Sequence, residues 1–547
     1  MMMSEDAPEY GGTFIMLTLS DRRPAVDPHD PLNALQILFW DYEPLLGFKQ
    51  PYDPAVGPEV IPMLATEVVP DAAGTTYTVS LRQGVKWHDG EDFNADDVVA
   101  TFKRLIDPDP EHVLMRRALG MKQTLKDIRR VNEFTVEMEL YEPDATFVDL
   151  LAHQVYVITP QHLIVGENPN GATAEERWRF MQDDDVPGSI GVGTGPFKLV
   201  EWEPDGSQTF ERNDDYWGVD AAGNRLPYLD GAVNRKFEDA TRAFGSFVAR
   251  EGHVGQWTAQ PIPEQESLCG RARDSAECEV LLHGHGWFSW VVNNEQEVWQ
   301  DERVLTAAHY ATQSYKNMTV GRGPGTEGGA DLWINREWYP DATISLEEQY
   351  ELMPWTNPDN YTEYEQRARD ILAEAGYPNG LDLPQPIVAG GFLDFYIPLI
   401  ESWNNVGIRA VSDLGRPGVI QREQIAQGLW TATIQASGIT FNMPENSMLI
   451  SGASFSNTTT AGTFPWSGIE FIDQVLETSR TILDRDERYE YLKVVDREMA
   501  KPTHDQWAIG ITLAGETRHG CVNSYHPGPG MYEGRQPATT WLSEECR

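Results

Sequence analysis

Residues 77–108 combine the sequence patterns of a strand, a turn and a helix. Apolar and polar residues alternate over 77–81, which predicts a half-buried strand because successive strand side chains point to opposite faces. Asn94 suits the N-cap of a helix, and Asp97 stands three residues later, where it can complete a capping box. Apolar residues then recur at helical spacing, at Val98, Phe102 and Leu105. We therefore predict a strand, a turn and a helix that ends at Asp107-Pro108.

The same patterns predict further elements along the chain. Strict alternation over 134–140 predicts a strand, and a short helix is expected over 147–151. A hairpin is predicted over 197–212, with Pro204-Asp205-Gly206 as its turn.

Three helices are predicted in the second half of the chain, at 301–313, 364–375 and 484–501. Gly376 stands in the C′ position that ends the second of these helices. The third helix has one apolar face, formed by Leu492, Val495 and Met499. Both strands and helices are therefore expected along the chain.

Size and charge narrow the possible classes of protein. A chain of 547 residues exceeds what one hydrophobic core supports, so we expect two or more domains. Acidic residues outnumber Lys plus Arg by 85 to 42, and the net charge of −43 opposes binding to nucleic acid and anionic lipid. No apolar run approaches the ~18 residues of a transmembrane helix. The polar N-terminus fits either a cytoplasmic protein or one whose leader was removed, and its repeated Met favours the second.

The four cysteines fall into two pairs that are close in sequence. Cys269 and Cys278 flank a short polar loop, whereas Cys521 and Cys546 bracket a Gly- and Pro-rich tail. Neither pair has the spacing of zinc ligands. One or two disulfides in an oxidising compartment are expected, and four free thiols in a reducing cytosol are the alternative.

Several of these segments resemble the signatures of one protein family. Residues 77–108 match the pattern LR-x-G-V-x-(F/W)-x-D-G-x-x-(F/L)-x-A-x-D-V, and 193–218 match a hairpin from G-T-G-P-(F/Y) to Y-W-G. The three predicted helices follow in the family's order, although Leu305 stands where arginine is usual. The chain is therefore similar to the peptide/nickel-type (family five) solute-binding proteins of ABC importers.

The resemblance implies a bilobal α/β fold of the periplasmic-binding-protein (Venus-flytrap) type, with the extra subdomain of this family. The first lobe would comprise 1–40, 193–250 and 501–547, and the extra subdomain 41–192. The second lobe would span 251–500. The resemblance also implies that a ligand bridges both lobes and closes them about a hinge.

Enzyme motifs are missing from the sequence. It contains no G-x-S-x-G elbow, no H-E-x-x-H and no P-loop, and the GPGTEG at 323–328 neither follows a predicted strand nor opens a helix. His283 and His285 could share a metal on one strand face, but no third ligand lies nearby in sequence. We expect no enzymatic activity, no cofactor and no metal, with a secreted hydrolase of similar fold as a distant alternative.

Aromatic residues are the first candidates for ligand contact. Trp287 and Trp290 precede 291–294, where the family's strand crosses the cleft, and planar rings stack on sugars or peptide planes. Packing in the core is the alternative for each of them. Trp466 is a candidate cleft wall residue. His29 is a candidate that either contacts ligand or only shapes the Asp27-Pro28 turn.

The segment 430–444 bears on the class of ligand. In peptide-binding relatives, the loop after this strand carries an acidic residue that anchors the ligand's α-ammonium, whereas 435–442 contain no Asp or Glu. An unpaired buried ammonium costs several kcal/mol, so this absence favours a neutral, hydroxyl-rich ligand such as an oligosaccharide. The expected contacts are Gln435, Ser437, Thr440, Phe441 and Asn442.

We therefore expect a monomeric substrate-binding protein of an ABC importer, which captures a solute and delivers it to the permease. An oligosaccharide is favoured, and oligopeptides or a nickel complex are the alternatives. No nucleic acid partner is expected. The expected location is periplasmic or extracellular, and a lipidated N-terminus absent from this chain is a further alternative.

Overall fold

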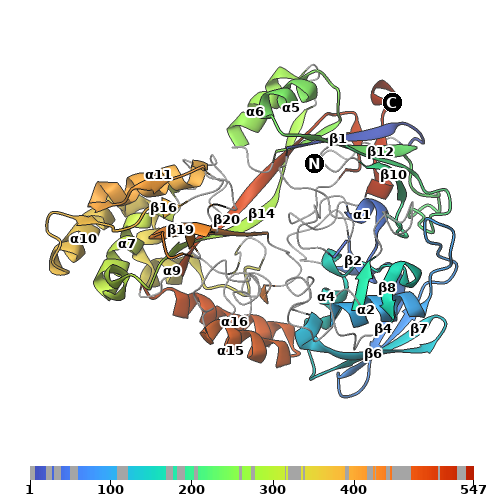
Figure 1. Ribbon diagram of the computed structural model, residues 1–547, viewed down its shortest axis with the longest axis horizontal. Coiled ribbons are helices and arrows are strands. Elements are labelled where there is room, and N and C mark those ends of the chain that lie inside the picture. Colours follow the sequence, from blue (N-terminus) through green and yellow to red (C-terminus); the bar gives the residue numbers. More distant parts are fainter. Residues whose placement is uncertain are drawn as a thin grey trace. The chain divides into compact units, whose positions relative to one another are not determined.

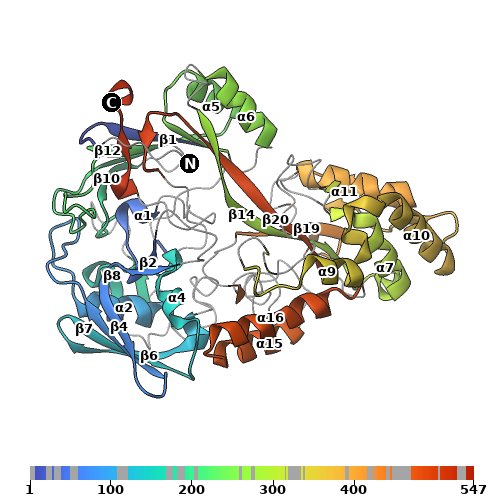
Figure 2. The ribbon, with the colours of Figure 1, turned by 180° about the vertical axis from the view of Figure 1, so that it is seen from behind.

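The computed structural model describes the following parts of the chain: 7–19, 28–29, 38–49, 59–106, 121–167, 177–180, 191–202, 207–257, 262–272, 278–314, 316–317, 334, 336, 339–388, 393–415, 420, 423–425, 427–438, 444–445, 470–502, 506–525 and 537–547. Helices and strands mix throughout them (Figures 1 and 2). No helix in these ranges is long and apolar enough to cross a membrane.

The chain divides into two compact units. Unit 1 contains Met1–Thr258, Glu264–His283 and Gly515–Arg547, and unit 2 contains Ala259–Pro263 and Gly284–Ala514. The sequence predicts the second lobe over 251–500. In the structure the main segment of unit 2 is Gly284–Ala514, so both of its boundaries lie later in the chain than predicted. The reason at the first end is that β13 (Val254–Gln256) pairs with strand β1 (Thr13–Leu19) and therefore belongs to unit 1.

The main sheet of unit 1 has the strand order β10-β11-β12-β1-β13-β20. β1 is parallel to both β12 and β13, whereas β20 is antiparallel to β13. Apolar residues that alternate along β1, such as Phe14 and Met16, are buried in the core beneath this sheet. The remaining strands are β10 (Phe197–Trp202), β11 (Gln208–Arg212), β12 (Gly231–Phe237) and β20 (Gln506–Arg518).

Two helices belong to this part of unit 1, α5 (Ala240–Val248) and α6 (Ile262–Arg271). α5 packs on β1, β12 and β13, as Figure 1 shows. Phe247 of α5 and Leu268 of α6 share a hydrophobic cluster with Leu17 and Trp257.

A second sheet of unit 1 contains the elements predicted from 77–140. Its order is β4-β5-β7-β6, with every neighbour antiparallel. The predicted strands are confirmed as β5 (Thr76–Leu81) and β7 (Thr135–Leu140), and the predicted helices as α2 (Ala95–Leu105) and α4 (Phe147–Leu151). The capping box of α2 is formed by Asn94 and Asp97 as predicted. The outer strands are β4 (Ala65–Pro70) and β6 (Leu125–Asn132).

Short elements complete unit 1. They are α1 (Leu38–Asp41), β2 (Leu46–Phe48), β3 (Val60–Pro62), β8 (Ile164–Glu167), β9 (Arg177–Phe180), β21 (Val522–Asn523) and β22 (Trp541–Leu542). The predicted hairpin is confirmed by the antiparallel pairing of β10 with β11.

In unit 2, β14 (Glu279–Val292), β19 (Ala432–Gly438), β16 (Ile387–Val388) and β18 (Ser412–Asp413) are neighbours in that order. A separate parallel pair is formed by β15 (Leu381–Asp382) and β17 (Ile408–Arg409). The helices are α7 (Glu302–Thr312), α9 (Leu346–Leu352), α10 (Tyr361–Glu374), α11 (Leu393–Val406), α15 (Glu470–Thr481) and α16 (Arg485–Met499).

The helices predicted for unit 2 are confirmed in α7, α10 and α16. Asp301 caps α7, and Gly376 follows α10 with φ +101°, the left-handed conformation that suits glycine after a helix. The predicted face of α16 is buried in one cluster with Ile472 and Val475 of α15.

Two strands run from one unit into the other, and two disulfides lie within unit 1. β14 and β20 each begin in one unit and end in the other. Disulfides join Cys269 to Cys278 and Cys521 to Cys546, so the expectation of one or two disulfides is confirmed.

Substitution of Asp97 tests whether its buried hydrogen bonds stabilise this fold. Its carboxylate is buried and accepts hydrogen bonds from the backbone N–H groups of Asn94 and Gln161 and from Trp87 Nε1, at 2.8–3.2 Å. Asp97→Ala leaves these buried donors without an acceptor, and we expect it to lower the free energy of unfolding by about 2–4 kcal/mol. Denaturant unfolding followed by tryptophan fluorescence measures the loss. The matched control is Asp96→Ala, which removes a half-exposed ion pair with Arg130 and should cost less than about 1 kcal/mol. Equal losses would contradict this role of Asp97.

Candidate functional site

Four of the predicted ligand residues of unit 2, namely Trp287, Trp290, Gln435 and Ser437, lie on one antiparallel ladder. β14 and β19 pair from Gly286↔Gly438 to Val292↔Ala432. Trp287 lies opposite Ser437, and Ser289 lies opposite Gln435. Because directly opposed residues share a face of the ladder, Trp287, Ser437 and Gln435 take register positions on one face.

Trp290 lies on the opposite face of this ladder, and the structure corrects its expected role. Its side chain is 0% exposed, and its ring packs edge-to-face against those of Trp403 and Tyr396, with centroids 5.1 and 5.9 Å away. Trp290 therefore belongs to the core of unit 2 and is not placed to stack on a ligand. The physical reason is the strand pleat, which sends Trp290 and Trp287 to opposite faces.

Other predicted contacts fall outside the described residues. They are Thr440, Phe441, Asn442 and Trp466. The side chains of His283 and His285 are likewise not described, and among those that are, no three His, Cys, Asp or Glu groups could hold a metal ion.

His29 is buried in unit 1 and held from two sides. Its Nε2 lies 2.9 Å from the carbonyl oxygen of Val157, and its Nδ1 lies 2.9 Å from Arg104 Nη1 of α2. Arginine can only donate, so Nδ1 accepts and Nε2–H donates, which defines a neutral tautomer. These contacts favour the interpretation that His29 shapes the turn.

A buried carboxylate network in unit 1 joins segments that are far apart in sequence. Glu43 Oε2 accepts hydrogen bonds from Thr194 Oγ1 and Trp217 Nε1, and Oε1 accepts one from Tyr216 OH, each at 2.8 Å. The Arg82 guanidinium lies 3.9 Å from the centroid of the Trp217 ring. We call these five residues the Glu43 node.

The electrostatics of the Glu43 node are dominated by burial. Glu43 is 2% exposed, and removal from water raises the pKa of its carboxyl group to about 7. The three hydrogen bonds and the Arg82 charge oppose this rise because they stabilise the carboxylate. The same burial, together with the Glu43 charge, raises the pKa of Tyr216 well above its usual value.

The loop 191–195, beside the node, lies between the backbone of Asp41 and the side chain of His88. His88 Nε2 donates to the carbonyl of Gly195 at 2.9 Å, and the N–H of Gly193 donates to His88 Nδ1 at 3.2 Å. Burial lowers the pKa of His88 to about 4, so its imidazole is neutral at pH 7. A Cβ added at Gly193 would lie 1.7 Å from the carbonyl oxygen of Asp41, so only glycine fits there. The two signature blocks of the sequence therefore contact each other through this loop.

The sequence analysis missed the Glu43 node. Its available signal was the placement of Asp41 and Glu43 inside the otherwise apolar run 37–48, because an acid in such a run is buried and needs partners. The identity of those partners could not be inferred, since Thr194 and Tyr216 lie more than a hundred residues away along the chain.

Comparison with known proteins identifies a family. The model of the bacterial extracellular solute-binding proteins, family 5 (middle region), matches residues 59–455. The chain is 26% identical over 347 residues to heme-binding protein A of Haemophilus influenzae, covering 60% of this chain and 57% of that protein. It is 25% identical over 346 residues to the dipeptide-binding protein of Escherichia coli, covering 59% and 56%. The matches span just over half the length of these curated relatives.

A solved structure shares the fold over almost the whole chain. It is the ABC transporter-associated periplasmic binding protein DppA from Helicobacter pylori in complex with the peptide STSA. The TM-score is 0.74 at 19% identity, and the match covers 98% of this chain and 99% of the other. The predicted fold class is therefore confirmed.

The core assignment of Trp290 can be tested by two substitutions. Trp290→Ala would leave a cavity beside Trp403, and we expect the free energy of unfolding to fall by about 3–5 kcal/mol. The indole N–H has no hydrogen-bond partner among the described residues, so Trp290→Phe should cost only about 1–2 kcal/mol. Thermal unfolding compares the two. Unchanged stability in Trp290→Ala would contradict the assignment.

The Glu43 node predicts a pH dependence of stability. A carboxyl group whose pKa rises from 4.5 to about 7 on folding favours the folded state only while it stays protonated. This contribution is therefore full below pH 4.5 and is lost as the pH rises to about 7, with a total change of about 3 kcal/mol. Glu43→Gln should remove this part of the profile, which urea unfolding between pH 4.5 and 8 would measure. The control is Glu59→Gln, which alters an exposed pair with Lys49 and should keep the wild-type profile.

Proposed function

Because the chain belongs to the bacterial extracellular solute-binding proteins of family 5, we propose that it captures a solute outside the cytoplasm and delivers it to the permease of an ABC importer. The match of the family model over 59–455 carries this proposal, and the shared fold of the Helicobacter pylori protein supports it. The family's description as extracellular and the two disulfides support an oxidising, extracytoplasmic location.

The comparisons correct the favoured class of ligand. Of the three relatives described above, one is named for dipeptides, one for heme, and one holds the peptide STSA, so an oligosaccharide has no support among them. We therefore propose a short peptide or peptide-like solute. The absence of acid from 435–442 removes only one possible partner for an ammonium group and therefore does not exclude a peptide.

The proposed mechanism is reversible closure of the two units on the ligand. A ligand that contacts both units shifts the population toward the closed form without covalent chemistry. Trp287, Gln435 and Ser437 are proposed contacts because the β14–β19 ladder brings them to one face. Thr440, Phe441, Asn442 and Trp466 also remain proposed contacts from the sequence.

The lack of an acid in 435–442 still has a consequence for a peptide ligand. Without a carboxylate in that stretch, no charged partner for a free α-ammonium is available there. We propose that the protein binds the peptide backbone and side chains and does not select the free amine. A micromolar dissociation constant corresponds to about −8 kcal/mol, which a few stacking contacts and hydrogen bonds supply at ~1–2 kcal/mol each.

A thermal-shift experiment tests this function. The probes are the peptide Ser-Thr-Ser-Ala, its N-acetylated form, maltotriose, heme and a nickel–histidine complex. A ligand at 100 times its dissociation constant stabilises the protein by about 2.7 kcal/mol, which raises the melting temperature by a few degrees. We expect shifts with both peptides and none with maltotriose.

Each other outcome contradicts a defined part of the proposal. A shift with the free peptide alone would show that the amine is selected by an acid outside 435–442. A shift with maltotriose alone would restore the oligosaccharide, and turnover of a bound probe would indicate an enzyme.

A further inference from the structure

The strand β14 has a root in unit 1, which we define as residues 279–283, before the chain enters unit 2 at Gly284. The described pairing of β14 with β19 runs only from Gly286 to Val292 and does not reach this root. The neighbouring strand on the other edge is β20. On the β19 edge, the residues that follow Gly438 lie outside the described part of the chain.

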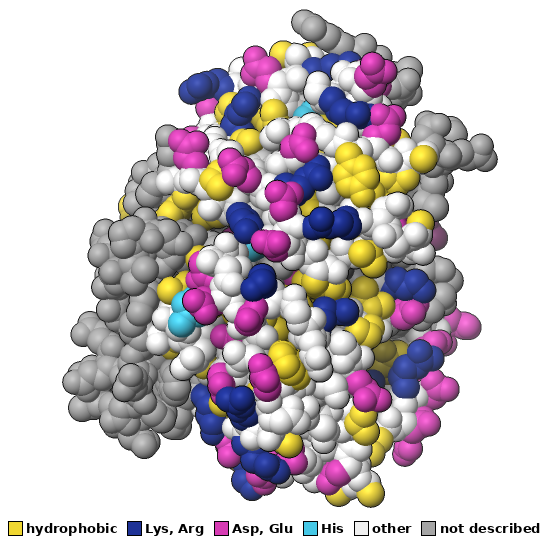
Figure 3. Space-filling view, turned by 90° about the vertical axis from the view of Figure 1, so that its right-hand side faces the viewer, with side chains coloured by type: hydrophobic (Ala, Val, Ile, Leu, Met, Phe, Trp, Pro, Cys, Tyr) yellow, Lys and Arg dark blue, Asp and Glu magenta, His cyan; other side chains and the backbone are white. Residues whose placement is uncertain are grey.

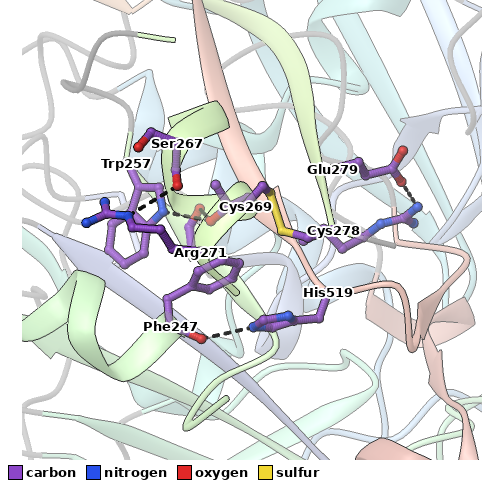
Figure 4. Close-up of a disulfide and its surroundings, with 11 residues drawn as sticks. Phe247, Trp257, Ser267, Cys269, Arg271, Cys278, Glu279 and His519 are labelled. Carbon is purple, nitrogen blue, oxygen red and sulfur yellow. Dashed lines mark hydrogen bonds and ion pairs between the residues drawn. A yellow bond between two sulfur atoms is a disulfide. The ribbon is translucent and has the colours of Figure 1, made fainter. Parts of the chain in front are cut away.

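A disulfide and an ion pair connect the root to its neighbours, and Leu281 of the root is buried in the core of unit 1. Cys278, which directly precedes β14, is bonded to Cys269 of α6 (Figure 4). Glu279, the first residue of β14, forms an ion pair with Arg518, the last residue of β20. The Arg518 side chain is 13% exposed and that of Glu279 is 43% exposed, so the pair is partly shielded from water.

β20 is anchored in a different way where it enters unit 1. Residues 516–518 pair with β13, and Trp257 Nε1 donates to Thr517 Oγ1 at 2.7 Å. His519 Nε2 donates to the carbonyl of Phe247 at 3.1 Å, and its ring stacks on that of Phe247 (Figure 4). This end of β20 is thus fixed by strand pairing, hydrogen bonds and ring stacking, and the Cys521–Cys546 disulfide follows it by three residues.

We propose that the Cys269–Cys278 disulfide and the Glu279–Arg518 ion pair act together as a clamp on the root of β14. The clamp ties the root to α6 and to the anchored end of β20. Bending of β14 is thereby confined to residues beyond His283. The consequence for closure rests on the proposed function: an oxidised clamp keeps the root ordered before ligand arrives, so that closure does not have to order it.

Hydrogen exchange of the ligand-free protein tests the clamp without any ligand. In C269S/C278S we expect the amides of 279–283 to exchange about tenfold faster, with the β13–β20 ladder unchanged. The matched control is C521S/C546S, which removes the other disulfide of unit 1 and should leave the root at its wild-type rate. Glu279→Gln keeps the disulfide, lies at a partly exposed position, and should accelerate the root about threefold.

Each possible result of the exchange experiment either supports or overturns the proposed clamp. Equal acceleration in C521S/C546S, faster exchange throughout unit 1, or an unchanged root in C269S/C278S would each overturn it. If C269S/C278S does not fold, Glu279→Gln decides, and an unchanged root in that variant overturns the clamp.

A measurement of the affinity for the peptide Ser-Thr-Ser-Ala tests the link between the clamp and closure, and it can fail independently of the proposed function. C269S/C278S should bind this peptide about three- to tenfold more weakly, because closure must then also order the root. Equal affinity despite faster exchange would overturn the link to closure. If the wild-type protein binds no peptide, the proposed peptide ligand fails, whereas the exchange experiment still decides the clamp.

Discussion

The close approach of the 191–195 loop to the backbone of Asp41 is the constraint on which unit 1 depends. The N–H of Gly195 donates to the Asp41 carbonyl at 2.9 Å, and Gly193 leaves no room for a side chain beside the same oxygen. His88 holds this loop from the other side through hydrogen bonds with Gly193 and Gly195. Three segments distant in sequence are thereby fixed to one another. A neutral histidine suits this position, since it donates from one nitrogen and accepts at the other.

This contact explains why a carboxylate can be buried beside it. Burial of Glu43 is unfavourable unless donors surround its oxygens, and Thr194, Tyr216 and Trp217 supply them. Those donors are in place only when the loop and the 213–217 turn are positioned against residues 41–43. The charged group and the glycine-rich loop therefore depend on each other.

The chain passes between the two units along β14 and β20, which are both continuous across the division. Their ends in unit 1 are held by different chemistry, a disulfide with an ion pair for β14, and hydrogen bonds with ring stacking for β20. Figure 3 shows acidic and basic side chains interspersed over the described part of one face.

Local patterns in the sequence determined the secondary structure and the family. The alternation over 77–81, the Asn94–Asp97 capping box and Gly376 after α10 each depend on neighbours within a few residues, and all were predictable for that reason. The even number of cysteines at loop positions likewise indicated disulfides, although not which cysteines pair. Only the tertiary structure decided that Trp290 is buried: it packs on Trp403 of α11, a contact between residues more than a hundred positions apart. The donors to Glu43 and the ion pair at the root of β14 were hidden for the same reason, because long-range contacts leave no periodic signal in the local sequence.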